Sequence, residues 1–495
     1  MRQGLSTLME KSICATLDLS KSLSNFSSEV TKCLELTNIT EWNGKILEER
    51  ERKIRELALI LAGQCIAILL YNLSQSQSAN QTAMNQTKGW WGGNMQKHGY
   101  RTRQILTVGN VLVTLKLPYM VRKNSIASTK NKISTQGVYP LLKWLGMSSG
   151  LTPLVWSTVA QYGAITSSFE AACTTLTGWG INLSLKRIER LTYKFGQIGI
   201  NLRQSKILNR QLGNLAEGNI LKGQRVVIAV DGGRSRIRIN KKGRKNSKTK
   251  RHGFIGKWVE PKLFTIYVID EQGKKINSSE IPITNDGTYE GYKALLEILE
   301  AYLVDLGISQ AKQVLLIGDG AEWIWIHIPP LLTRLGCPVE TYQLFDFYHV
   351  TENIKVFADA AFNEEAQSKE WFVKVRKSLK KGKAKSLISQ MDGLIAVATG
   401  ERCKIMVTKR NYILDAYREG RLNYDKAINK KLPIGSGAIE SLIRQVVNLR
   451  IKGNSKFWLK ENAEIMLHLR CQWIAGSWDN FCGSIFNSFI KPQTA

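Results

Sequence analysis

Three carboxylates of this sequence stand at positions that suit metal-assisted chemistry. Asp231 directly follows the apolar run "RVVIAV", and Asp319 directly follows "QVLLIG". Because buried strands of a largely parallel sheet bring their carboxyl ends to a common edge, we expect these two side chains to lie close together. Glu440 lies in "PIGSGAIES", where a small, turn-forming stretch leads into the expected first turn of a helix. Gly435 and Gly437 are expected to permit a tight turn that other residues could not easily follow, and Ser436 to help cap this helix.

Converging carboxylates repel one another unless a cation neutralises them. Mg²⁺, or Mn²⁺ in its place, prefers oxygen ligands and fills its remaining positions with water or phosphate oxygens. A pair of such ions can activate an attacking oxygen and stabilise a leaving one at phosphorus. Asp231, Asp319 and Glu440 are therefore predicted metal ligands, although a single Asp after a strand is most often a turn residue or a helix cap.

Asp346 and His349, in "FDFYH", follow another apolar run, "TYQLF". At the same edge of the sheet, Asp346 would serve as a further metal ligand and His349 as a donor to phosphate. The alternative is structural: Asp346 caps the helix that begins at Phe347, and His349 packs against the sheet. The residues alone leave both interpretations open.

The composition favours a polyanionic partner. The 495 residues include 70 Lys and Arg against 40 Asp and Glu, a formal net charge of +30, which points to nucleic acid, with an acidic membrane surface as the alternative. The longest apolar run, 57–73, is interrupted by Gln64 and is shorter than the roughly 20 residues that cross a bilayer. We expect a buried helix or a self-association surface there, and no membrane partner.

The sequence shows neither a secretory signal nor a cysteine motif. No basic segment followed by an apolar stretch and a small-residue cleavage site begins the chain, so a cytoplasmic, nucleoid-associated protein is expected. The eight cysteines are scattered singly, without a C-x-x-C motif or a His at ligand spacing. This predicts neither a zinc site nor disulfides.

The periodicity of the sequence divides the chain into modules. Residues 1–80 are expected to be a helical module, and 81–145 a polar linker followed by a β-hairpin around Gly109-Asn110. Residues 146–215 are helical, and two helices around "WGIN" are similar to a helix-turn-helix. Its second helix offers basic side chains to DNA, although a basic helix face is often only solvated: Lys186, Arg187, Arg190 and Lys194.

The second half has an α/β pattern. Three segments, the apolar "RVVIAV" and then "KLFTIYVID" and "KKINSSEIPI", are expected as strands, followed by an amphipathic helix and two further buried strands. Residues 222–346 and 433–495 thus form a mixed sheet with helices. Residues 347–432 have helical periodicity and must leave this domain and return to it, which predicts a helical insertion.

Four segments together resemble the core of a DDE transposase: "VVIAVDGGRSRIRI", "LLIGDGAEWIW", "LFDFYHVTENI" and "LPIGSGAIESLIRQVVNLRIKGNSKFWLKENAEIMLHLR". The family they resemble most is the Kra-type family of bacterial insertion sequences, over roughly residues 90 to 482. The resemblance implies a ribonuclease-H-like catalytic fold in which Asp231, Asp319 and Glu440 are the catalytic residues. Some relatives carry cysteine pairs after the hairpin, which "PYMVRKNSIAS" lacks, so metal-supported folding of that region is in doubt.

The resemblance also implies an activity and its partners. Such enzymes use Mg²⁺ to hydrolyse a phosphodiester at the element's ends and then join the exposed 3′-hydroxyl to target DNA. The expected partners are double-stranded DNA, as terminal inverted repeats and target, and further copies of the chain, since two ends must be held together. Two alternatives remain open: a catalytically idle DNA-binding protein derived from a transposase, and a nuclease of the same fold.

Further basic residues are expected at the DNA. The run 238–253 lies in a loop after the first strand and can neutralise phosphates, unless it is only a solubilising loop. Arg444 lies one turn after Glu440, and the residues beyond it interleave cations with an aromatic ring that can stack on a base or lie in a core. The predicted DNA-binding residues outside the helical region are Lys241, Lys242, Arg244, Lys245, His349, Arg444, Arg450, Lys452, Lys456 and Trp458.

Overall fold

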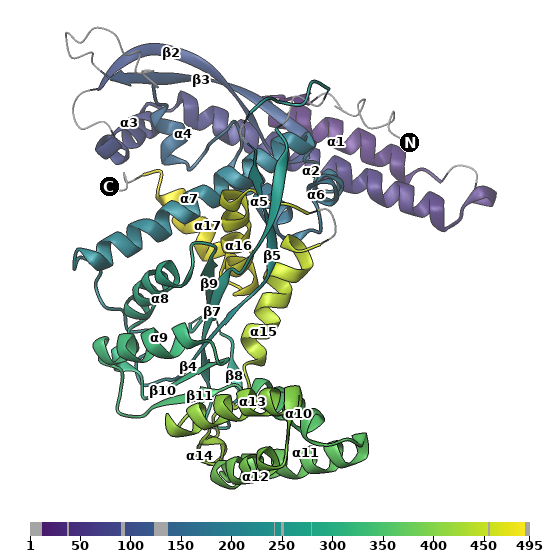
Figure 1. The fold of residues 1–495 in the computed structure, drawn as a ribbon. Coiled ribbons are helices and arrows are strands. Elements are labelled where there is room, and N and C mark those ends of the chain that lie inside the picture. Colours follow the sequence, from purple (N-terminus) through teal and green to yellow (C-terminus); the bar gives the residue numbers. More distant parts are fainter. Residues whose placement is uncertain are drawn as a thin grey trace. The chain divides into compact units, whose positions relative to one another are not determined.

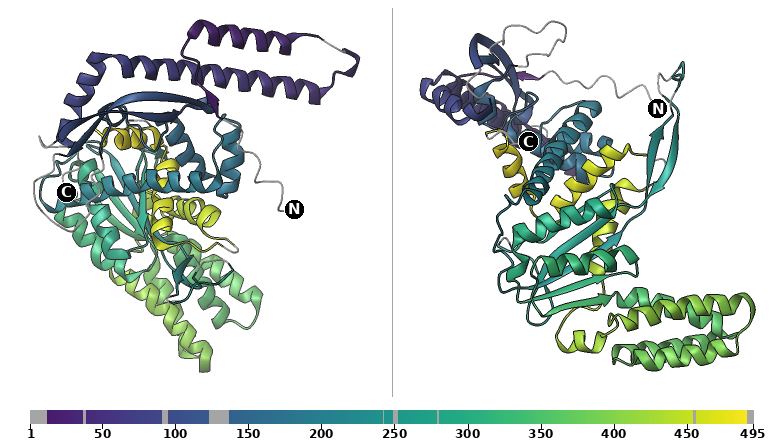
Figure 2. Two further views of the ribbon diagram at one scale, coloured as in Figure 1. Left: turned by 90° about the horizontal axis from the view of Figure 1, so that it is seen from above. Right: turned by 60° about the vertical axis from the view of Figure 1, so that its left-hand side comes forward.

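A computed structural model describes residues 12–36, 39–90, 95–122, 137–241, 243–248, 252–278, 280–453 and 456–490. The chain divides into two compact units, Met1–Ser205 with Trp478–Ala495, and Lys206–Ser477. Figures 1 and 2 show the elements of both units.

A long hairpin organises the first unit. Strands β2 (Met95–Leu106) and β3 (Val111–Arg122) pair antiparallel, as the alternating pattern predicts, and β1 (Ile13–Cys14) adds in parallel to β3. The turn places Gly109 at φ 68° and Asn110 at φ 57°, the left-handed region that these two residue types tolerate best. Alternate residues of β3 are fully buried in this unit's core.

Helices flank this hairpin, and one of them corrects a prediction. They are α1 (Leu19–Leu34), α2 (Gly44–Gln75), α3 (Gln77–Gln86) and α4 (Pro140–Trp144). The polar stretch expected as a linker is largely helical, because the Ser76 hydroxyl accepts the Ala79 N–H at 3.2 Å and Ala79 and Ala83 bury one face of α3. By length and composition alone, α2 is apolar enough to cross a membrane, and 28% of its most apolar window is buried.

Aromatic packing closes the first unit. Helices α5 (Pro153–Ile165), α6 (Phe169–Thr177), α7 (Leu185–Gln211) and α17 (Trp478–Asn487) follow the hairpin in this part of the structure. The Trp156 indole N–H donates to the Leu191 carbonyl at 3.1 Å, and the Phe195 ring contacts the rings of Trp156 and Trp478. These contacts bind α5 and α17 to α7.

The second unit is built on a mixed sheet with the strand order β11-β10-β4-β7-β8, in which β9 also pairs with β7. Strands β4, β10 and β11 run parallel, whereas β7 is antiparallel to β4, β8 and β9. The strands are β4 (Arg225–Gly232), β7 (Lys262–Ile269), β8 (Lys275–Ile276), β9 (Thr284–Thr288), β10 (Gln313–Gly318) and β11 (Thr341–Phe345). The α/β class predicted from the sequence is thus present.

Helices cover both faces of this sheet (Figure 2). On β7, Phe264 contacts the Tyr302 ring of α8 (Tyr292–Leu306). The neighbouring residues Thr265 and Tyr267 face the opposite side, beneath α15 (Gly437–Ile443), as the alternation of side chains along a strand requires. Helices α9 (Glu322–Arg334) and α16 (Lys460–Ile474) belong to the same unit.

Two features of the strands differ from the prediction. Only Lys275 and Ile276 of the segment "KKINSSEIPI" form a strand, and the next strand, β9, consists of the polar residues "TNDGT". The basic run 238–253 begins in a strand and ends just before another, because β5 (Ser235–Asn240) and β6 (Phe254–Val259) pair antiparallel as a separate ribbon. The loop of this hairpin is shorter than the sequence suggests.

Between β11 and α15, the chain is helical, as its periodicity predicts. The five helices are α10 (Phe347–Ala361), α11 (Glu365–Lys380), α12 (Ala384–Ala396), α13 (Gly400–Arg418) and α14 (Tyr424–Asn429). They form the green layer at the lower end of this unit in Figure 1. After α15 the helix continues with π-type hydrogen bonding over Arg444–Ile451.

Candidate active site

Three aspartates end three adjacent parallel strands in the same register. Gly318 of β10 lies opposite both Val230 of β4 and Phe345 of β11. The next residue along each chain segment is an aspartate: Asp231, Asp319 and Asp346. Their common position follows from the register, and it places three carboxylates at one edge of the sheet.

Asp346 is the best anchored of the three. It is fully buried, and its Oδ1 accepts the backbone N–H groups of Tyr348 at 2.6 Å and His349 at 2.9 Å, which caps α10. Its Oδ2 accepts the Ser436 N–H. Burial alone would raise the pKa of Asp346, but hydrogen bonds from His349 and Ser436 outweigh it and lower that pKa to about 2. The helix-cap role considered for Asp346 is therefore present.

Asp231 is held differently. Burial, together with the neighbouring charge of Asp319, raises its pKa to about 6, although a hydrogen bond from the Gly232 N–H at 2.6 Å acts in the opposite direction. The His349 charge opposes this rise. The Asp319 carboxylate accepts the Ala321 N–H at 2.9 Å. Asp231 is thus an acid whose ionised form lacks sufficient positive charge around it.

His349 supplies part of that positive charge. Its Nδ1 lies 3.6 Å from Asp346 Oδ1, and this carboxylate, assisted by the charge of Asp231, raises the pKa of His349 to about 9 despite partial burial. An imidazole with this pKa is protonated at neutral pH in the absence of a metal, so a metal ion would have to displace that proton to bind the ring. In this state His349 acts as an internal cation among the acids.

Glu440 comes to the same edge from α15. Within the described ranges, ligand atoms of Asp346, His349 and Glu440 lie within 4.8 Å of one another, a grouping that can hold a metal ion. The Ser436 hydroxyl, expected to cap α15, makes no capping hydrogen bond and instead lies 3.3 Å from Glu440 Oε1. Asp346 thereby positions Glu440, because it binds the backbone of the residue that begins this turn.

The glycines of the turn have a different role from the one expected. We expected Gly435 and Gly437 to permit a tight turn that other residues could not follow, yet neither has a positive φ. A Cβ at Gly435 would lie 2.6 Å from the Tyr348 ring, whereas one at Gly437 meets no atom within 4 Å. Gly435 is therefore required by close packing, and Gly437 is not.

The helical insertion contributes a residue that the sequence did not suggest. Tyr412 of α13 packs against Gly320, where a Cβ would lie 2.2 Å from its ring. Burial and the charges of Asp319 and Asp346 raise the pKa of Tyr412. Glu260, also unforeseen, adds negative charge near Asp231. Both residues are distant in the sequence from the acids they adjoin, so no local motif could have identified them.

The carboxylates at this edge have the chemistry of a divalent-cation site, but among the described residues the group whose ligand atoms lie within 4.8 Å of one another is Asp346, His349 and Glu440, without Asp231 or Asp319. Asp231, Asp319 and Glu440 offer carboxylate oxygens, which are the ligands that Mg²⁺ and Mn²⁺ prefer. Burial and the charge of Asp319 raise the pKa of Asp231, and a bound cation would offset this effect by stabilising the ionised carboxylate. Asp346 is less suited to bind the ion, because its oxygens already accept three backbone N–H groups.

The predicted DNA-binding residues fall into two groups. Exposed cations are Lys186, Arg190, Lys194, Lys241, Arg244, Lys245, Arg444 and Lys452. Arg187, Arg190 and Lys194 line a cavity of about 400 Å³ in the first unit, where Lys194 donates to the hydroxyls of Ser148 and Ser149, both at 2.9 Å. Lys242 lies outside the described residues.

The remaining predicted contacts are engaged within the protein. Arg450 is buried beneath the Trp458 ring, and the Trp458 indole donates to the Ile451 carbonyl at 3.0 Å. Lys456 donates to the Arg450 carbonyl at 3.1 Å. These three residues stabilise the segment after the π-helical turn, where Trp458 is half-buried and not in the core.

Comparison with known proteins adds little to this geometry. No protein-family model and no curated protein matches the chain. A chain of the Drosophila P element transposase strand transfer complex is similar to it with a TM-score of 0.22 and 10% identity, over 70% of this chain and 85% of that one. A structural similarity this low identifies neither the family nor the function of the protein.

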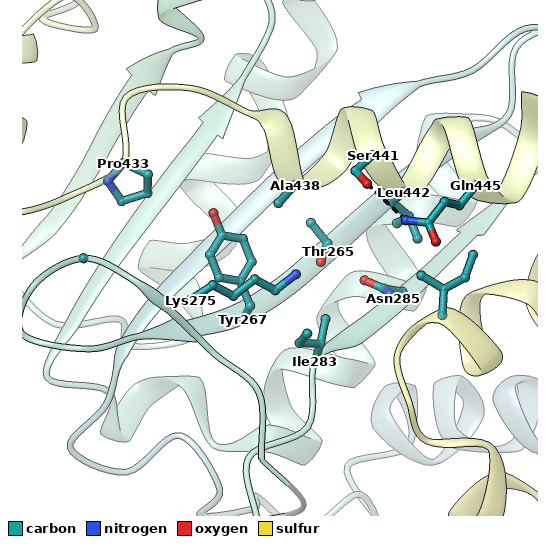
Figure 3. Close-up of a pocket in the computed structure, with 12 residues that line it drawn as sticks. Thr265, Tyr267, Lys275, Ile283, Asn285, Pro433, Ala438, Ser441, Leu442 and Gln445 are labelled. Carbon is teal, nitrogen blue, oxygen red and sulfur yellow. Dashed lines mark hydrogen bonds between the residues drawn. The ribbon is translucent and has the colours of Figure 1, made fainter.

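A separate cavity lies on the other side of α15. It has a volume of about 450 Å³ and is lined by Thr265, Tyr267, Lys275 and Asn285 from the sheet, and by Ala438, Ser441 and Leu442 from α15. Figure 3 shows Lys275 beside the Tyr267 ring, 4.9 Å from its centroid. None of the strand-end aspartates lines this cavity, so it is distinct from the candidate active site.

Proposed function

We propose that this protein is a DNA transposase that cleaves and joins DNA strands in a metal-dependent reaction. The observation that carries the proposal is the register of β4, β10 and β11, which brings Asp231, Asp319 and Asp346 to one edge of the sheet, where Glu440 lies near Asp346. A net charge of +30 suits a DNA substrate. The strand order of the sheet supports a ribonuclease-H-like core, in keeping with the sequence resemblance to DDE transposases.

In this proposal, Asp231, Asp319 and Glu440 hold Mg²⁺ or Mn²⁺. The bound ions would activate the attacking oxygen and stabilise the leaving oxygen at the phosphodiester. Asp346 fixes the start of α15 through the Ser436 N–H and so orients Glu440. His349, protonated next to Asp346, offers positive charge to a DNA phosphate at this edge.

The proposal includes assembly as well as chemistry. Holding two DNA ends requires more than one copy of the chain, so we expect a homo-oligomer on DNA, acting at the nucleoid. The exposed cations of α7 and of the β5–β6 loop would contribute phosphate contacts, whose strength falls with salt.

The test uses DNA that carries the segments flanking the gene, incubated with the full chain and Mg²⁺ or Mn²⁺. We expect the wild type to nick the end and to join the 3′-hydroxyl to a second DNA. Glu440→Gln should reduce both products to background, whereas Glu365→Gln, at an exposed carboxylate of α11, should leave them unchanged.

Each other outcome has a distinct meaning. Cleavage by Glu440→Gln at the wild-type rate would refute the assignment of Glu440. Cleavage without joined product would identify a nuclease, and binding without cleavage by the wild type would identify a catalytically idle DNA-binding protein.

A further inference from the structure

The β5–β6 ribbon presents an ordered row of flat side chains on one face. The register pairs Arg236 with Trp258, Arg238 with Gly256, and Asn240 with Phe254. Since paired residues of two strands share a face, the arginines of β5 and the two rings of β6 all stand on the same side of the ribbon.

Arginines and rings alternate along this face. The guanidinium groups of Arg234 and Arg236 lie 5.2 and 4.8 Å from the centroid of the Trp258 ring, and that of Arg238 lies 5.0 Å from the Phe254 ring. Phe457 extends the row, because its ring lies 5.2 Å from Phe254 and its centroid is 5.6 Å from Arg236.

The row remains accessible although it is well supported. Trp258 is 42% exposed and Phe254 is 41% exposed. The edge of β5 that faces away from β6 is held in place, since the backbone N–H of Arg238 donates to the Trp458 carbonyl at 2.7 Å. Gly256 allows Phe457 to approach, since a Cβ there would lie 2.9 Å from its ring. Exposing large aromatic rings to water is unfavourable, so rings held in exposed positions on a well-fixed strand indicate a binding surface.

The charge of the segment defines the chemistry of that partner. Residues 234–259 are rich in Lys and Arg and contain no Asp or Glu. Guanidinium groups bind phosphate oxygens through paired hydrogen bonds, while aromatic rings and guanidinium planes stack on nucleobases. A partner that carries both phosphates and accessible base faces matches every group in the row.

We propose that this face, formed by Arg234, Arg236, Arg238, Phe254 and Trp258, binds an unpaired strand of DNA. In a duplex the base faces are covered by their neighbours, stacked about 3.4 Å apart along each strand. Trp258 and Phe254 are four residues apart on β6, or about 13 Å at about 3.3 Å per residue. Rings spaced in this way require bases that have been spread apart.

This role extends the proposed function, because strand transfer exposes an unpaired end, and it rests on DNA being the substrate. The binding itself needs no catalysis. It can therefore be measured in EDTA, where loss of binding and loss of cleavage are separate results.

The experiment is a fluorescence-anisotropy titration of the full chain with a labelled 20-nucleotide single strand of mixed sequence and with the matching duplex. Removing one stacking ring from a single-strand site typically weakens binding by about tenfold. We expect Trp258→Ala and Phe254→Ala each to weaken binding of the single strand by about tenfold and binding of the duplex by less than about twofold. Tyr417→Ala, at an exposed ring of α13, is the matched control and should bind both DNAs as the wild type does.

A second variant tests the charges without removing a ring. Arg234→Gln should lower the slope of log affinity against log salt for the single strand by about 0.7, the value of one phosphate contact. Unchanged single-strand affinity in both ring variants, with the wild-type salt slope in Arg234→Gln, would overturn the proposal. Equal losses for single strand and duplex would also overturn it, because the ribbon would then contact only the DNA backbone.

Discussion

Replacing Asp231 by Asn should stabilise the protein in the absence of metal. Asn keeps the acceptor oxygen for the Gly232 N–H, which Asp231 binds at 2.6 Å, but it removes a charge that burial and Asp319 disfavour. The pKa of Asp231 is about 6 in the folded protein against an ordinary value of 3.8. At about 1.36 kcal/mol per pKa unit, this difference corresponds to about 3 kcal/mol.

The sign of the effect fixes its pH dependence. An acid whose pKa is raised on folding costs no stability below about pH 4, where it is protonated in both states, and its cost is complete above about pH 6. The wild type therefore loses about 3 kcal/mol across this window, whereas Asp231→Asn does not. At pH 5 roughly half of the difference should be present.

The assay is urea unfolding in EDTA, followed by tryptophan fluorescence at pH 5 and pH 8. With a denaturant slope of about 3 kcal/mol/M, the variant's midpoint should exceed that of the wild type by about 1 M at pH 8. Asp415→Asn, at an exposed carboxylate of α13, serves as the control and should not shift. Mg²⁺ should raise the midpoint of the wild type and not that of Asp231→Asn.

A variant midpoint equal to or below that of the wild type at pH 8 would refute the reasoning. It would mean that the Asp231 carboxylate is already neutralised in the metal-free protein. The aspartates at this edge of the sheet would then not need a bound cation to balance their charge.

Three further variants test the supports of the site. Gly435→Ala should destabilise the fold by about 1 to 3 kcal/mol, because its Cβ would lie 2.6 Å from the Tyr348 ring. Gly437→Ala should be neutral or slightly stabilising in α15. Chemical denaturation compares the two variants, and equal effects on the free energy of unfolding would contradict the packing argument. Asp346→Asn should lower the free energy of unfolding by about 2 to 4 kcal/mol in the same assay, since an amide cannot accept all the backbone N–H groups that the carboxylate binds. An unchanged free energy of unfolding would show that the helix cap is dispensable. The wild type should lose about 1 kcal/mol of folding stability as pH rises from about 6.5 through 9, a value that allows for screening of the partly exposed His349. His349→Gln should abolish this loss. A wild type whose stability does not change over this pH range would contradict the raised pKa of His349.

The strand-end acids could be predicted because their signals are local. β4 and β10 each contain an uninterrupted apolar run that leads into an aspartate, and such runs indicate buried parallel strands, whereas β11 is the more polar "TYQLF". Their exact register is set by the pairing of Gly318 with Val230 and Phe345, which no sequence pattern specified. The approach of Glu440 likewise depends on where the helical insertion returns.

Strand β9 shows why other elements could not be predicted. Its residues are polar, yet Asp286 is fully buried because the Tyr302 hydroxyl and His468 Nδ1 lie at 3.0 and 3.1 Å from its carboxylate. His468 is 182 residues away, so local periodicity carries no trace of this contact. By contrast, the signal for α3 was available in Ser76 and in the spacing of Ala79 and Ala83, but polar composition obscured it.

Placement of the metal is the most direct test of the central claim. Fe²⁺ with ascorbate and peroxide, substituted for Mg²⁺ in the purified protein, generates hydroxyl radicals that cut the polypeptide where the ion is bound. We predict fragments that end near Asp231, Asp319 and Glu440, that disappear with excess Mg²⁺, and that Asp319→Asn no longer produces. Cuts that avoid all three positions, or that persist in Asp319→Asn, would contradict a metal centre at this edge of the sheet.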